Sequence, residues 1–191
     1  MEIYKFELKE FFREMENFLH DDNKKTILIR GYFNLDKLKS VFYLINQNFN
    51  SKSLVLYTRI SKIFLEDDIK KSNLRIQNQI DFKSTYKMDN NNSICFKKIN
   101  KSLDFNNSYD FAIFYPVQLS KPDDFKIYKK MIENVNSEKN ILITTNDTNR
   151  SSEELYEVAD ECLILDTSNI DENRGNKLKS ISEDLNGELP Y

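Results

Sequence analysis

Five short apolar runs, each separated from the next by a polar or amphipathic segment, constrain the fold of this 191-residue chain more than any other feature. Short continuous apolar runs are typical of strands that are buried on both faces, and helical segments between them predict parallel neighbours. The fold class is therefore α/β, with a mostly parallel central sheet of about five or more strands and helices on both of its faces. The five runs span residues 26–31, 53–58, 109–115, 140–145 and 161–166.

The chain is expected to form a single domain over residues 1–191, because no linker or internal repeat divides it. An amphipathic helix is predicted over about residues 6–19, where aromatic and apolar side chains recur at helical spacing. Residues 167–191 are predicted to form an acidic C-terminal tail. The asparagine-rich stretch 72–108 is predicted to hold one or two strands with connecting loops.

Composition excludes several classes of function. A single His and two Cys cannot supply a Cys/His zinc site, a disulfide scaffold or catalysis by several histidines, so no metal site is expected. No apolar run reaches the length of about 18 residues that a membrane helix needs. A cytoplasmic protein without a membrane partner is the expectation.

A loop-like segment after the first predicted strand carries a motif with defects. The phosphate-binding P-loop reads Gly, four residues, Gly, Lys and Ser or Thr, between a strand and a helix. Here Gly31 and Lys37 fall in register, whereas Asp36 replaces the second glycine and Leu38 replaces the hydroxyl that would bind Mg²⁺. Gly31, Asp36 and Lys37 are therefore candidate nucleotide-binding residues of a vestigial or weak site. The alternative is a chance match, a glycine that ends a strand and a lysine in the next helix.

The order of the motifs adds to this one. The P-loop-like segment is followed by KSLVLYTRIS, then YDFAIFYPVQL, then NILITTNDTNR, and finally EELYEVADECLIL. In this order the chain resembles the RecA-like P-loop ATPases, particularly the DnaB-type replicative helicases and the RadA and KaiC branch. The resemblance implies a RecA-like three-layer sandwich. It also implies a protein partner or self-association, because this fold commonly assembles edge to edge.

The departures from the family are concentrated in its chemistry. Thr58, Arg59 and Ile60 occupy the place of the family's catalytic glutamate, and Tyr115 and Pro116 stand near the place of the Walker B acid. We therefore expect no catalytic residues, no hydrolysis and no cofactor. The expected function is that of a non-hydrolysing accessory or scaffold subunit, a pseudo-ATPase that binds protein in a DNA- or RNA-processing assembly or in a defence or mobile-element assembly.

A second hypothesis is a divergent ATPase. It would bind ATP through Lys37, with a metal ion held by Asp36 or Asp110. A carboxylate beside a triphosphate repels it, which weighs against this alternative.

A third hypothesis is direct nucleic-acid binding through the middle of the chain. Residues 52–101 hold eleven Lys or Arg against five acids, whereas residues 151–191 hold three bases against eleven acids. Phe82 or Tyr86 could stack on bases, and the acidic tail could engage a basic partner or shield the basic region. An ordinary solvated surface is the alternative explanation. The candidate phosphate-binding residues are Lys62, Lys70, Lys71, Arg75, Lys83, Lys87, Lys97 and Lys98.

Overall fold

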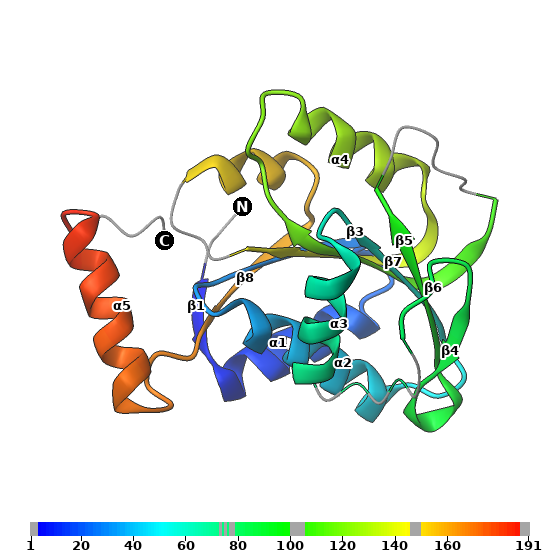
Figure 1. Cartoon of the computed structure of the whole chain (residues 1–191), viewed down its shortest axis with the longest axis horizontal. Coiled ribbons are helices and arrows are strands. Elements are labelled where there is room, and N and C mark those ends of the chain that lie inside the picture. The colour runs from blue at the N-terminus through cyan, green and yellow to red at the C-terminus, as the bar shows by residue number, and fades with distance from the viewer. Residues whose placement is uncertain are drawn as a thin grey trace.

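A computed structural model gives the fold as one eight-stranded sheet with helices on both faces (Figure 1). The strand order is β1-β8-β2-β7-β6-β3-β5-β4, and all neighbours are parallel except β4, which runs antiparallel to β5. The strands are β1 (Tyr4–Glu7), β2 (Thr26–Arg30), β3 (Ser53–Thr58), β4 (Thr85–Lys87), β5 (Ser93–Lys98), β6 (Ser108–Val117), β7 (Asn136–Thr144) and β8 (Glu161–Asp166). The structure describes residues 4–72, 74, 76, 79–99, 106–145 and 150–187.

The helices form the two outer layers. Figure 1 shows α1, α2 and α3 below the sheet, α4 above it, and α5 standing at one side of the body. Within the described ranges, no helix is long and apolar enough to cross a membrane. The helices are α1 (Leu8–His20), α2 (Asn34–Asn48), α3 (Lys62–Lys71), α4 (Asp124–Asn134) and α5 (Glu172–Asp184), with 3₁₀ turns η1 (Asp89–Asn91) and η2 (Arg150–Glu157).

Alternating side chains of each central strand fill two separate cores. In β2, Ile27 and Ile29 pack with α1 and α2, whereas Leu28 packs on the opposite face with Tyr128 of α4 and Leu155 of η2. Every residue of β2 is therefore buried, which is why the sequence shows a continuous apolar run rather than an alternating one. The predicted fold class, a mostly parallel sheet covered on both faces, is confirmed.

Several element boundaries differ from the prediction. Residues 4–7 pair with β8 as an edge strand, so the first helix begins at Leu8 instead of about residue 6. The stretch 72–108 contains β4, η1 and β5, and the predicted acidic tail contains α5. These strands lie at or near the sheet edges, where shorter and more polar segments are accommodated.

Candidate functional site

Helix α2 begins close to the end of β2. Its first residue is Asn34, so only Tyr32 and Phe33 separate it from Gly31. Lys37 therefore lies in the first turn of the helix, and its side chain is completely buried. A P-loop holds phosphate with successive backbone amides of a longer loop, and this connection has little room for such a cradle.

The ammonium group of Lys37 is surrounded by acceptors of the protein itself. It donates hydrogen bonds to the carbonyl oxygen of Gly31 at 2.5 Å, to the carbonyl oxygen of Thr145 at 2.8 Å and to Oγ1 of Thr144 at 3.3 Å. A lysine ammonium has three N–H donors. These contacts tie the carboxyl end of β2 to the carboxyl end of β7.

Gly31 has a structural reason of its own to be glycine. Its φ is +134°, a conformation that side chains with a Cβ rarely adopt. A Cβ at this position would lie 2.3 Å from the carbonyl oxygen of Leu165 in β8. The missing side chain therefore allows the close approach of β8, whether or not a phosphate ever meets this residue.

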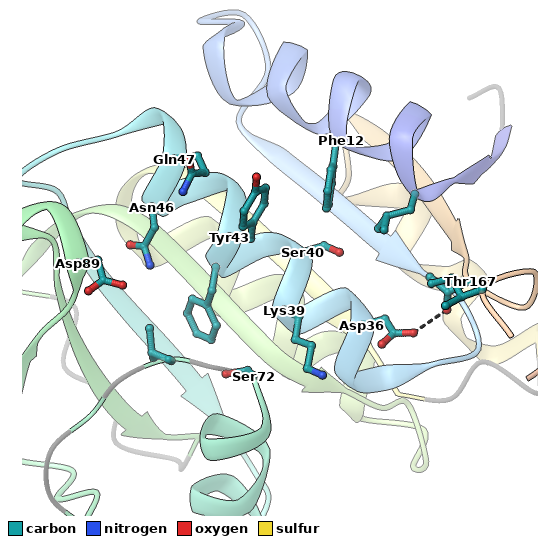
Figure 2. A pocket seen from close by; sticks show the side chains of 14 residues that line it. Phe12, Asp36, Lys39, Ser40, Tyr43, Asn46, Gln47, Ser72, Asp89 and Thr167 are labelled. Atoms are coloured by element: carbon teal, nitrogen blue, oxygen red, sulfur yellow. Dashed lines mark hydrogen bonds between the residues drawn. The ribbon is translucent and has the colours of Figure 1, made fainter.

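Asp36 is directed toward the C-terminal segment instead of toward Thr145. Its carboxylate accepts a hydrogen bond of 2.6 Å from Oγ1 of Thr167 and forms an ion pair with Arg174 of α5. Figure 2 shows the hydrogen bond between Asp36 and Thr167 at one end of a groove along α2, where Phe12 of α1 faces Tyr43. The groove has a volume of about 360 Å³. Of the three predicted nucleotide-binding residues, Gly31 and Lys37 are in contact, and Asp36 is engaged elsewhere.

Asp110 lies near the amino ends of the parallel strands, whereas Lys37 lies near their carboxyl ends. It is the third residue of β6, and its carboxylate binds Nζ of Lys52 at 2.6 Å and both the amide and the hydroxyl of Ser53 at 2.7 Å. A metal ion held by Asp110 would therefore lie at the other end of the strands from a phosphate bound at Lys37, so the divergent-ATPase hypothesis cannot use Asp110 as its metal ligand. Across the described ranges, no group of three or more His, Cys, Asp or Glu side chains could hold a metal ion.

The structure brings one carboxylate to the carboxyl edge that the sequence analysis missed. Asp68 of α3 accepts a hydrogen bond of 3.0 Å from the hydroxyl of Tyr115, which accepts one of 3.2 Å from the side-chain Nδ2 of Asn34. Burial raises the pKa of Asp68 above its ordinary value. These residues adjoin a cleft of about 400 Å³ that Asn34, Asp68, Gln118 and Thr145 help to line.

The spacing of the buried residues along α3 is the signal that could have identified Asp68. Leu65 and Ile69 are buried, and Asp68 lies three residues after Leu65, on the same side of the helix. A single carboxylate, a tyrosine hydroxyl and an amide make this a polar cleft. The ammonium group of Lys37 does not contribute to it, because it is hydrogen-bonded to the strand ends.

The predicted basic residues divide between two ends of the molecule. Lys62 begins α3 beyond the carboxyl end of β3, and Lys97 and Lys98 end β5. Lys83 precedes β4 and lies beside the same end of β5, because Thr85 pairs with Cys95. Three others lie toward the amino ends of the strands. These three are Lys70, Lys71 and Lys87. Arg75 falls outside the described residues.

Comparison with known proteins gives a likeness in structure alone. No protein-family model matches the sequence, and no curated protein matches it. Two crystal forms of the large terminase from a thermophilic bacteriophage are similar to the chain, each with a TM-score of 0.54. Crystal form 2 is 9% identical over 89% of this chain, and the ADP complex in crystal form 3 is 10% identical over 92%.

The chain spans about half the length of these terminases, since 49% of each terminase chain is covered. At this level of identity the likeness shows the fold and nothing finer. The chain thus shares with these terminases an α/β fold built on a mostly parallel sheet with helices on both faces.

Proposed function

We propose that this chain is a non-hydrolysing RecA-fold accessory or scaffold subunit that acts by binding other macromolecules. The observation that carries the proposal is the position of Lys37, whose ammonium group is buried and hydrogen-bonded to the ends of β2 and β7. A phosphate would have to displace these bonds before it could gain the charge of the lysine. The same lysine therefore serves the fold at the place where an ATPase would use it for catalysis.

Two neighbours support the proposal. Leu38 supplies an apolar side chain to the core where a P-loop supplies the hydroxyl that binds Mg²⁺. Asp36, in the place of the second glycine, adds a carboxylate at the beginning of α2, where a phosphate would otherwise meet the positive end of the helix.

The test of the proposal is phosphate release from MgATP. We expect the wild-type protein to bind no MgATP and to release no more phosphate than Lys37→Met, because neither a phosphate cradle nor a Mg²⁺ hydroxyl ligand accompanies the lysine. Lys37-dependent release above the rate of uncatalysed hydrolysis would contradict the proposal. It would favour the divergent-ATPase alternative, with which the ADP complex of the similar terminase is consistent.

A nucleic acid is the second candidate partner, because four of the predicted lysines lie near the carboxyl ends of β3 and β5. A triple variant of Lys62, Lys83 and Lys97 to Gln is expected to weaken single-stranded DNA binding and to lower the slope of log K against log salt by about two. Fluorescence anisotropy at several salt concentrations measures this slope. A matched triple of Lys70, Lys71 and Lys87 to Gln should leave it unchanged, and equal effects of both triples would contradict the assignment.

The proposal also includes three assignments that are more specific than the fold. They are descent from the DnaB, RadA and KaiC branch, a cytoplasmic location, and a role in a nucleic-acid-processing, defence or mobile-element assembly. The order of motifs from about Thr26 to Asp166 supports the first of these, and the departures around Lys37 support a binding role over a motor role.

A further inference from the structure

A second cavity opens at a topological switch point, on the α4 side of the carboxyl edge. The chain leaves β3 through α3 toward β5 and leaves β6 through α4 toward β7, in opposite directions along the sheet. Crevices beyond the carboxyl ends of strands at such points are the usual ligand sites of α/β sheets. Here the crevice is a cavity of about 640 Å³, within the range of about 300–1,000 Å³ typical of small-molecule sites.

Two contacts orient the side chain of Arg59 at this cavity. Its Nη1 donates to Oδ1 of Asp124 at 2.6 Å, and its guanidinium lies 4.9 Å from the ring centroid of the buried Tyr128. Asp124 is only 4% exposed, and its other oxygen accepts the backbone amides of Ser120 at 2.9 Å and Lys121 at 2.8 Å. Although burial acts to raise the pKa of Asp124, the bonds from Arg59 and the amides lower it, so the carboxylate stays charged.

This pairing uses only part of the guanidinium. In the part of the chain that the structure describes, Arg59 makes no hydrogen bond other than that to Asp124, and an arginine has five N–H donors. Lys121 and Asp123 also line the cavity, and the carboxylate of Asp123, on an 80% exposed side chain, lies 3.5 Å from Nζ of Lys126. The lining therefore holds two cations and two carboxylates, and the feature that it offers to an anion is the set of unused N–H donors of Arg59.

The remaining walls are largely apolar. Ile60, Ile99, Pro116 and Ile127 line the cavity. A guanidinium with unused donors beside apolar walls can discriminate a ligand that has an anionic end and an apolar body.

We infer that this cavity is a binding site for a small organic anion, a phosphate monoester or carboxylate carried on an apolar body, with Arg59 as its anion-binding residue. Arg59 stands just after β3, where the RecA-like resemblance predicts a catalytic glutamate. The sign of the charge is reversed there, which suits anion binding and not the activation of a water molecule. The site is independent of Lys37, so it goes beyond the proposed function.

The test is a titration of the ¹⁵N-labelled full chain with phenyl phosphate, followed by amide chemical shifts. We expect saturable shifts centred on Arg59, Gln118 and Tyr128, with no such shifts from inorganic phosphate or benzyl alcohol at the same concentrations. Equal affinity for inorganic phosphate would contradict the apolar part of the site, and equal affinity for benzyl alcohol would contradict the anionic part. Shifts centred on Gly31 and Lys37 would also overturn the inference.

Two variants separate recognition from folding. Arg59→Gln is expected to weaken phenyl phosphate binding at least about tenfold, the scale of a lost charge-assisted hydrogen bond. Because this change also leaves Asp124 without its partner, Ile127→Glu at the 39% exposed wall is the second variant. It keeps the Arg59–Asp124 pair and should weaken binding by repulsion. Unchanged affinity in folded protein of both variants would overturn the inference, and would leave the proposed function untouched, since phenyl phosphate does not test MgATP binding at Lys37.

Discussion

The variant Lys37→Met is expected to lower the free energy of unfolding by about 2–3 kcal/mol, the cost of leaving buried acceptors without donors. Methionine matches the length and helix propensity of lysine, so the packing of α2 is largely retained. The carbonyl oxygens of Gly31 and Thr145 and the hydroxyl of Thr144 lose the donor they share in the native protein. If the lysine instead served to bind phosphate, the opposite result is expected. Its removal would then weaken nucleotide binding and leave the free energy of unfolding unchanged.

Urea unfolding at equilibrium measures this difference. The matched control is Lys39→Met in the same helix, whose side chain is half-buried at the groove of Figure 2. Its effect should stay within about 0.5 kcal/mol, as for most surface substitutions. If the two variants were equally stable, Lys37 would not hold the strand ends together.

The second large effect is expected from Gly31→Ala, which should cost about 3–5 kcal/mol through backbone strain and steric overlap together. The added Cβ would lie 2.3 Å from the carbonyl oxygen of Leu165, at a φ of +134°. Relief would require β8 to move away from β2, although these strands pair along their length.

Thermal or urea unfolding of Gly175→Ala provides the control. Gly175 lies inside α5, where an added Cβ would meet only the carbonyl oxygen of Ser168 at 3.5 Å. Alanine there should be neutral or stabilise by up to about 1 kcal/mol, because glycine is costly within a helix. A loss of less than about 1 kcal/mol in Gly31→Ala, below the usual cost of such strain, would contradict the close approach of β8.

The central strands could be predicted from sequence because burial on both faces makes them continuously apolar. The edge strand β1 could not, since Tyr4–Glu7 is only four residues long and runs directly into α1, so its apolar residues merge with the helical pattern. Its identity depends on pairing with β8, with Phe6 opposite Leu165. β4 is three residues long and polar, so it too depends on its neighbour, β5.

The candidate site was predictable only in its local part. The register of Gly31 and Lys37 is visible in seven consecutive residues, but the acceptor at Thr145 lies 108 residues away along the chain. The same holds for Asp68 and Tyr115, which are 47 residues apart. Spacing within a motif can show that a lysine is present, whereas the groups that its ammonium contacts are determined by the order of strands in the sheet.

Calorimetric titration of ATP, with and without Mg²⁺, into the wild-type protein and Lys37→Met tests the central claim most directly. If Lys37 holds the strand ends together, neither protein should give a saturable heat, and the two titrations should coincide. Saturable binding to the wild-type protein that is lost in folded Lys37→Met would contradict the account, and would restore a working nucleotide site at the beginning of α2.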